Sequence, residues 1–205
     1  MRRSAFQRTT WLRLLAGATA FLWFALPSAS GEDEQKVWVT GNYSFSDELG
    51  GFKIRAAGGN GTTDNPFVIT QEVLSASPVT MVIRAQRPIR YFDGTSHGGF
   101  THFRIEVVNS SGLAWLECEF ELQEILHKPS IFGDGLSFDQ RKSDTDTVSS
   151  NSFAHWSRDF EPYDKLLFHD GKVDPKAIAT FTFLVTDFTP RRTFYLVFDP
   201  RIPFS

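Results

Sequence analysis

The sequence alternates apolar and polar residues with a period of two along most of its length, and this pattern restricts the possible folds most. From Lys36 onward, short runs rich in Val, Ile, Phe and Thr are bounded by Gly, Pro, Asn and Ser. Such alternation is typical of strands with one buried and one exposed face. No long amphipathic helix pattern occurs after residue 36. We therefore predict an all-β fold.

Nine runs are predicted to form strands, and the abundance of Phe indicates how they pack. The runs are residues 36–45, 51–57, 66–74, 79–86, 100–109, 113–122, 165–169, 178–187 and 193–198. The chain has 21 Phe residues, whose bulk suits the inner faces of two sheets packed about 10 Å apart. The sequence predicts a two-sheet antiparallel sandwich, immunoglobulin-like or jelly-roll, because strand counts do not separate these topologies.

Two short polar segments are predicted to connect hairpins. One is "NSSG", Asn109–Gly112, and the other is "TPRR", Thr189–Arg192, between the last two strands. Each separates two alternating runs, as the loop of a hairpin does.

The segment from Leu126 to Asp164 does not follow the alternating pattern. It contains clusters of Gly, Ser, Asp and Pro, with "LSFDQ" and "SFAHW" as its possible short strands. Loops of this length are uncommon in compact domains and are often functional. We predict that this segment carries the function.

Within this segment, "HWSRDFEPYD" is the predicted contact surface for a ligand. Trp156, Phe160 and Tyr163 could present flat faces to sugar rings or to a partner's apolar side chains, and Arg158 could donate hydrogen bonds beside them. The alternative is that these aromatic side chains fold back and cap the open end of the sandwich.

Three glutamates form the most ordered ionisable pattern in the chain. Glu117, Glu119 and Glu121 alternate with apolar residues at 116, 118, 120 and 122. Glutamates two residues apart on a strand lie about 7 Å from one another, a spacing that would suit inverting sugar hydrolysis. An open strand face desolvates carboxylates little, however, and catalytic acids need desolvation. We predict a solvent-exposed face, with Cys118 as a buried thiol on the opposite side.

No other pattern points to catalysis or metal binding. The sequence has no nucleophile elbow, and its five histidines lack the spacing of a zinc site. "SDTDTVSSN" places Asp144 and Asp146 in a polar loop, but Val148 and Ser149 break the calcium-loop pattern. We predict no catalytic residues, no metal ligands and no cofactor.

The first thirty residues are predicted to be a signal peptide. Four arginines precede an apolar run from Leu14 to Leu26, which is too short to span a bilayer comfortably. Small residues at Ser28 and Ser30 predict cleavage after Ser30, which leaves a single sandwich domain at residues 31–205. The alternative is an uncleaved anchor, in which Trp11 and Leu12 lengthen the apolar segment.

Charge and cysteine content agree with an exported protein that does not bind nucleic acid. Cleavage removes four of the 21 basic residues and none of the 24 acidic residues, which leaves a net charge of about −7. Such an acidic chain has no electrostatic footprint for nucleic acid. A single cysteine allows no internal disulfide. We predict a periplasmic or extracellular protein with no membrane span in its mature chain.

Four segments of the second half of the chain share a style of strands and turns: "IEVVNSSGLAWLECEFEL", "GDGLSFD", "LLFHDGKVDPKAIATFTFLVTD" and "FYLVFDPRIP". Over roughly residues 100–203, the chain thereby resembles uncharacterised exported bacterial β-sandwich proteins. The resemblance is a pattern of strands and turns, and it implies a sandwich fold and export but no known activity.

These observations predict an exported, non-catalytic binding or structural module of the bacterial envelope, with a protein or carbohydrate partner. The alternative function is a secreted carbohydrate-active hydrolase. It would use two carboxylates of the long loop, from the set Asp134, Asp139, Asp159 and Glu161.

Overall fold

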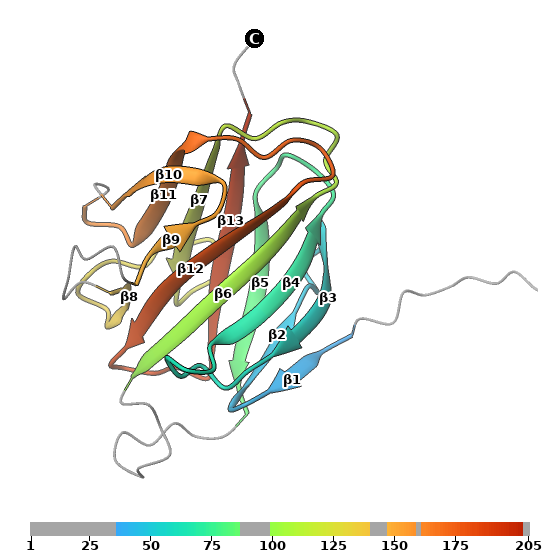
Figure 1. The fold of residues 1–205 in the computed structure, drawn as a ribbon. Coiled ribbons are helices and arrows are strands. Elements are labelled where there is room, and N and C mark those ends of the chain that lie inside the picture. Colours follow the sequence, from blue (N-terminus) through green and yellow to red (C-terminus); the bar gives the residue numbers. More distant parts are fainter. Residues whose placement is uncertain (1–35, 87–98, 140–146, 159–160, 203–205) are drawn as a thin grey trace, which may run out of the picture. The chain divides into compact units, whose positions relative to one another are not determined.

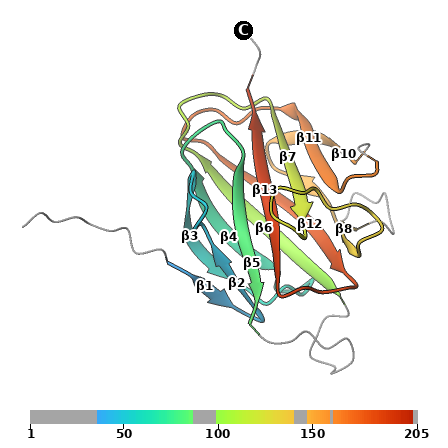
Figure 2. The same ribbon diagram turned by 180° about the vertical axis from the view of Figure 1, so that it is seen from behind.

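Two facing β-sheets make up the structure, which is a computed structural model (Figures 1 and 2). It describes residues 36–86, 99–139, 147–158 and 161–202. These residues form thirteen strands and no helix. The sheets have seven and six strands, and the predicted all-β sandwich is confirmed. The proposed signal peptide, residues 1–30, lies outside the described residues.

The seven-stranded sheet is antiparallel throughout and has β7 in its interior. Its order is β1 (Trp38–Thr40), β2 (Tyr43–Ser46), β5 (Val79–Ala85), β13 (Thr193–Arg201), β7 (Glu117–Gln123), β11 (Lys165–Gly171) and β10 (Phe153–Ser157). The first predicted run divides into β1 and β2 because Gly41 turns the chain between them with a φ of 55°. That left-handed conformation suits glycine.

The six-stranded sheet includes one parallel pair, which the sequence did not predict. The order is β3 (Phe52–Gly58), β4 (Phe67–Val73), β6 (Phe100–Asn109), β12 (Ile178–Asp187) and β8 (Leu136–Phe138), and β9 (Ser149–Ser150) also pairs with β12. Strands β4 and β6 are parallel. Parallel neighbours need a long connection, and here β5 in the opposite sheet lies within it.

Phenylalanine rings fill the space between the sheets. Phe120 on β7 is fully buried. Its ring lies 5.0–6.1 Å, centroid to centroid, from four others: Phe168, Phe181, Phe183 and Phe198. Two of these rings come from β12 in the opposite sheet, so this cluster joins the two sheets. The predicted role of the abundant Phe is confirmed.

The two predicted hairpin loops instead connect strands in different sheets, so that prediction is wrong. Asn109–Gly112 begins with the last residue of β6 in the six-stranded sheet and leads to β7 in the seven-stranded sheet. The Asn109 amide donates to the carbonyl oxygens of Leu113, at 2.7 Å, and Val173, at 3.0 Å. Thr189–Arg192 likewise crosses between the sheets, from β12 to β13. Turn residues shape a loop, but they do not determine which sheet contains the next strand.

Cys118 is fully buried on the inward face of β7, as predicted. Burial raises the pKa of its thiol well above the usual range, and the nearby charge of Asp199 acts in the same direction. Thiol reagents attack through the thiolate. We expect a bulky thiol reagent to label the native protein at least ~100-fold more slowly than the unfolded protein. Equal labelling rates with and without denaturant would contradict this placement.

Candidate functional site

The three glutamates of β7 all point away from the core, as the alternation predicts, but they are not all exposed. The exposed fractions of the side chains are 40% for Glu117, 5% for Glu119 and 12% for Glu121. The prediction of a solvent-exposed face is therefore wrong for Glu119 and Glu121. The physical reason is that β7 lies between β11 and β13, whose outward side chains cover it.

Each glutamate of β7 is paired with a cation from a neighbouring strand. Lys165 on β11 places its Nζ 2.9 Å from Glu119 Oε1 and 2.8 Å from Glu121 Oε2. Arg201 on β13 contacts Glu117 at 3.4 Å and also binds Glu119. Burial lowers the pKa of Lys165, but its hydrogen bonds to Glu121 and Glu119 outweigh burial, so its pKa is raised.

Asp199 is a further carboxylate on this face, and the sequence analysis did not single it out. It lies directly opposite Glu119 in the pairing of β13 with β7. Burial raises the pKa of Asp199, and the charge of Glu119 raises it further, whereas the charges of Arg201 and Lys165 act in the opposite direction. Within the described residues, neither a hydrogen bond nor an ion pair reaches its carboxylate. Lys165 and Arg201 are bound by the glutamates instead.

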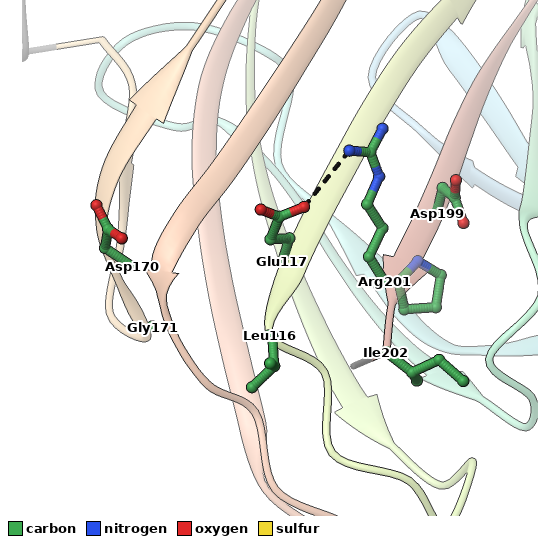
Figure 3. Close-up of a pocket in the computed structure, with 8 residues that line it drawn as sticks. Leu116, Glu117, Asp170, Gly171, Asp199, Arg201 and Ile202 are labelled. Atoms are coloured by element: carbon green, nitrogen blue, oxygen red, sulfur yellow. Dashed lines mark hydrogen bonds and ion pairs between the residues drawn. The ribbon is translucent and has the colours of Figure 1, made fainter. Parts of the chain in front are cut away.

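A hollow of about 920 Å³ lies where β7 begins and where β11 and β13 end (Figure 3). Its apolar lining comes from Leu116, Pro200 and Ile202. Its charged lining comes from Glu117, Asp170, Asp199 and Arg201. Figure 3 shows Asp170 on one side and Asp199 on the other, with Glu117 and Arg201 between them.

The hollow lies where β13 continues beyond its pairing with β5. Strand β13 pairs with β5 as far as Phe198 but with β7 as far as Arg201. The segment Asp199–Arg201 therefore extends past its pairing with β5. Pro200 is compatible with this position because proline cannot donate a hydrogen bond to a sheet and is found where pairing ends.

Two histidines hold Asp170 at the edge of the hollow. His155 on β10 lies directly opposite His169 on β11, and their rings stack with centroids 5.8 Å apart. The Nδ1 atom of each lies 3.0 Å from Asp170 Oδ2. The next residue must be glycine, because a Cβ at Gly171 would lie 2.0 Å from the carbonyl oxygen of Ser152. Histidines 14 positions apart in sequence thus meet through the pairing of β10 with β11.

The residues predicted to form the contact surface lie in different environments. Trp156 lies opposite Phe168, is partly buried and packs against the core. Tyr163 is exposed and forms a backbone bridge with Ile131. No contact between the rings of Trp156 and Tyr163 occurs in the described part of the chain. Phe160 lies outside the described residues.

Arg158, the fourth predicted contact residue, is half-buried near two buried carboxylates. Burial lowers the pKa of Arg158, and the charges of Asp139 and Asp164 oppose this shift. Both aspartates are almost fully buried, and Ser137 Oγ donates to Asp164 Oδ2 at 3.3 Å. All four of these residues lie within the segment from Leu126 to Asp164.

We expect Trp156→Ala to lower the free energy of unfolding by about 1–3 kcal/mol, because its ring packs against the core. Tyr163→Ala should change it by less than about 0.5 kcal/mol, because this side chain is exposed. Equilibrium urea denaturation of the two variants measures both values. A larger loss for Tyr163→Ala than for Trp156→Ala would contradict these placements.

The loop carboxylates suggested for a hydrolase that the structure describes lie in different environments. Asp134 accepts hydrogen bonds from the backbone N–H groups of Ile131, at 3.0 Å, and Leu136, at 3.1 Å. Asp139 is buried, whereas Glu161 is exposed. Asp159, Asp144 and Asp146 lie outside the described residues. Asp134 thus stabilises a turn, and Asp139 is shielded from a substrate.

Among the described residues, no group of three or more His, Cys, Asp or Glu side chains is arranged to hold a metal ion. That part of the chain also contains no helix of the length and apolarity needed to cross a bilayer. No known family model, curated protein or solved structure matches this chain.

Proposed function

We propose that the protein is an exported, non-catalytic binding module of the bacterial envelope, and that its ligand contacts the hollow at the beginning of β7. The observation that carries this proposal is the lining of the hollow. It combines the carboxylate of Asp199, which forms no ion pair with any described residue, with the apolar side chains of Leu116, Pro200 and Ile202. A concave apolar surface with a few polar groups is the usual form of a binding site.

The arrangement of the glutamates supports binding over catalysis. A catalytic carboxylate must reach its substrate, yet Glu119 is 5% exposed and is held by both Lys165 and Arg201. Such pairing fixes the side chains in place. It gives the sheet a rigid outer face beside the hollow.

A carbohydrate hydrolase is the second candidate, and one observation favours it. Asp199, with its raised pKa, lies directly opposite Glu119 on the neighbouring strand. Two neighbouring carboxyl groups, one of which has a raised pKa, are the arrangement of many glycosidases. Release of reducing sugar from a panel of polysaccharides, abolished by Asp199→Asn, would support this candidate against the binding module.

A pull-down from envelope extract tests binding at the hollow. The hollow variant carries Leu116→Ser and Ile202→Ser, which remove two exposed apolar side chains. The control carries Leu74→Ser, just after β4, and Ile178→Ser, at the beginning of β12, which are similarly exposed apolar positions of the six-stranded sheet. We expect the wild type and the control to retain the same ligand and the hollow variant to lose it. Retention by all three proteins would contradict the proposal.

Export predicts a specific N-terminus. The charged and apolar pattern of residues 1–30 should direct secretion and cleavage after Ser30. N-terminal sequencing of the protein recovered outside the cytoplasm should therefore begin at Gly31. A sequence that begins at Met1 would show that residues 1–30 are retained.

A further inference from the structure

We propose that the ligand of the hollow is a segment of a partner protein that presents a lysine or arginine side chain to Asp199. This inference rests on the proposed binding function and specifies its ligand. It follows from the charge, the unpaired carboxylate and the apolar wall of the hollow.

The charges that line the hollow do not balance. Three carboxylates, from Glu117, Asp170 and Asp199, face one guanidinium, from Arg201. Arg201 already binds Glu117 and Glu119. An approaching cation would therefore be attracted and an approaching anion repelled.

Among the carboxylates that line the hollow, Asp199 would gain the most electrostatic stabilisation from an incoming cation. It is half-buried and lies directly opposite Glu119. No cation of the described residues forms an ion pair with it, because Lys165 and Arg201 are bound to the glutamates of β7. A cation from a ligand would offset both the burial of this carboxylate and its repulsion by Glu119.

The apolar wall favours a cation carried on an aliphatic stem. Leu116 and Ile202 are exposed at the hollow, and Pro200 lies between Asp199 and Arg201 in the same lining. Lysine and arginine bury their methylene stems on such surfaces and keep their charged ends near a carboxylate. Sugar rings prefer aromatic faces, and none of the residues described as lining the hollow is aromatic. The lining thus fits a basic side chain better than a neutral sugar.

Nuclear magnetic resonance titration with three blocked peptides tests this inference. The peptides share one sequence except at two positions, which are both lysine, both glutamine or both glutamate. We expect the lysine peptide to shift the backbone amide signals of Leu116, Glu117 and Arg201, and to bind less tightly as salt increases. The glutamine and glutamate peptides should leave these signals unchanged.

Asp199→Asn should weaken binding of the lysine peptide about tenfold, because the substitution removes the charge and keeps the shape of the side chain. Asp64→Asn is the matched control, because Asp64 is an exposed aspartate in the loop between β3 and β4. It should leave the affinity unchanged. Amide spectra of both variants establish that they are folded. The salt dependence of binding to the wild type tests, independently of any variant, whether charge contributes to the affinity.

The possible outcomes separate this inference from the proposed function. Equal binding of the lysine and glutamine peptides, or tighter binding of the glutamate peptide, would contradict the proposal that the ligand is cationic. Equal binding of spermidine and the lysine peptide would contradict a protein segment as the ligand and would indicate a free polyamine. If no peptide binds but the pull-down shows a ligand that the hollow variant loses, the inference fails and the proposed function stands. If neither experiment detects binding, both fail.

Discussion

Replacing Phe120 with alanine is expected to lower the free energy of unfolding by about 3–5 kcal/mol. Phe120 is fully buried, and its ring contacts four other Phe rings from both sheets. Truncation removes this apolar contact and leaves a cavity where the sheets meet. The lost contacts and the cavity both destabilise the fold, because the surrounding side chains can close the cavity only in part.

Equilibrium denaturation in guanidinium chloride measures this loss. Phe188→Ala is the matched control, because Phe188 is 48% exposed and, among the described residues, its ring contacts that of Phe100 alone. It should cost about 1 kcal/mol or less. Equal losses for the two variants would show that Phe120 is not at the centre of the core.

Replacing Asp187 with asparagine is expected to stabilise the protein at alkaline pH but not in acid. Asp187 ends β12, is almost fully buried and accepts a hydrogen bond from the Thr189 N–H at 3.2 Å. Burial raises its pKa from 3.8 to about 7. The backbone hydrogen bond from Thr189 and the charge of Arg191 lower the pKa, whereas the charges of Glu124 and Asp134 raise it further.

The raised pKa determines the direction of the pH dependence. The folded state binds this proton more tightly than the unfolded state, so the associated stability is fully present below the unfolded pKa. It decreases as pH rises and is lost once pH passes the folded pKa of about 7. The difference between a pKa of 3.8 and one of about 7 corresponds to about 4 kcal/mol of unfolding free energy.

Asparagine cannot ionise, but it keeps an oxygen that can accept from Thr189. Relative to wild type, Asp187→Asn should therefore gain up to about 4 kcal/mol of unfolding free energy at about pH 8 and little at about pH 4. Urea denaturation across this pH range measures the difference. Asp64→Asn, at an exposed aspartate, should show no such trend. A pH-independent difference for Asp187→Asn would contradict the raised pKa.

The period of two allowed the strands and the direction of their side chains to be predicted from the sequence. The inward placement of Cys118 and the outward placement of the β7 glutamates both follow from alternation along one strand. The strand pattern also located β8 and β10 within the long loop. These are local properties, and they depend only on neighbouring residues.

The candidate site depends on which strands lie side by side, and alternation does not determine that. Asp199 and Glu119 are 80 positions apart in sequence, and they meet because β13 pairs with β7. His155 and His169 meet in the same way across β10 and β11. Exposure of Glu119 was predicted wrongly for this reason, since Lys165 and Arg201 come from the two neighbouring strands.

Photo-crosslinking in the producing cell tests most directly whether the hollow is the binding site. A photoreactive residue replaces, one at a time, Leu116 in the hollow, Tyr163 in the long loop and Leu74 beside the six-stranded sheet. The native side chains at these positions are similarly exposed, at 40%, 45% and 47%. We predict a crosslinked product from position 116 that Asp199→Asn suppresses, and none from position 74. A product from position 163 with none from position 116 would contradict the account and place binding on the long loop.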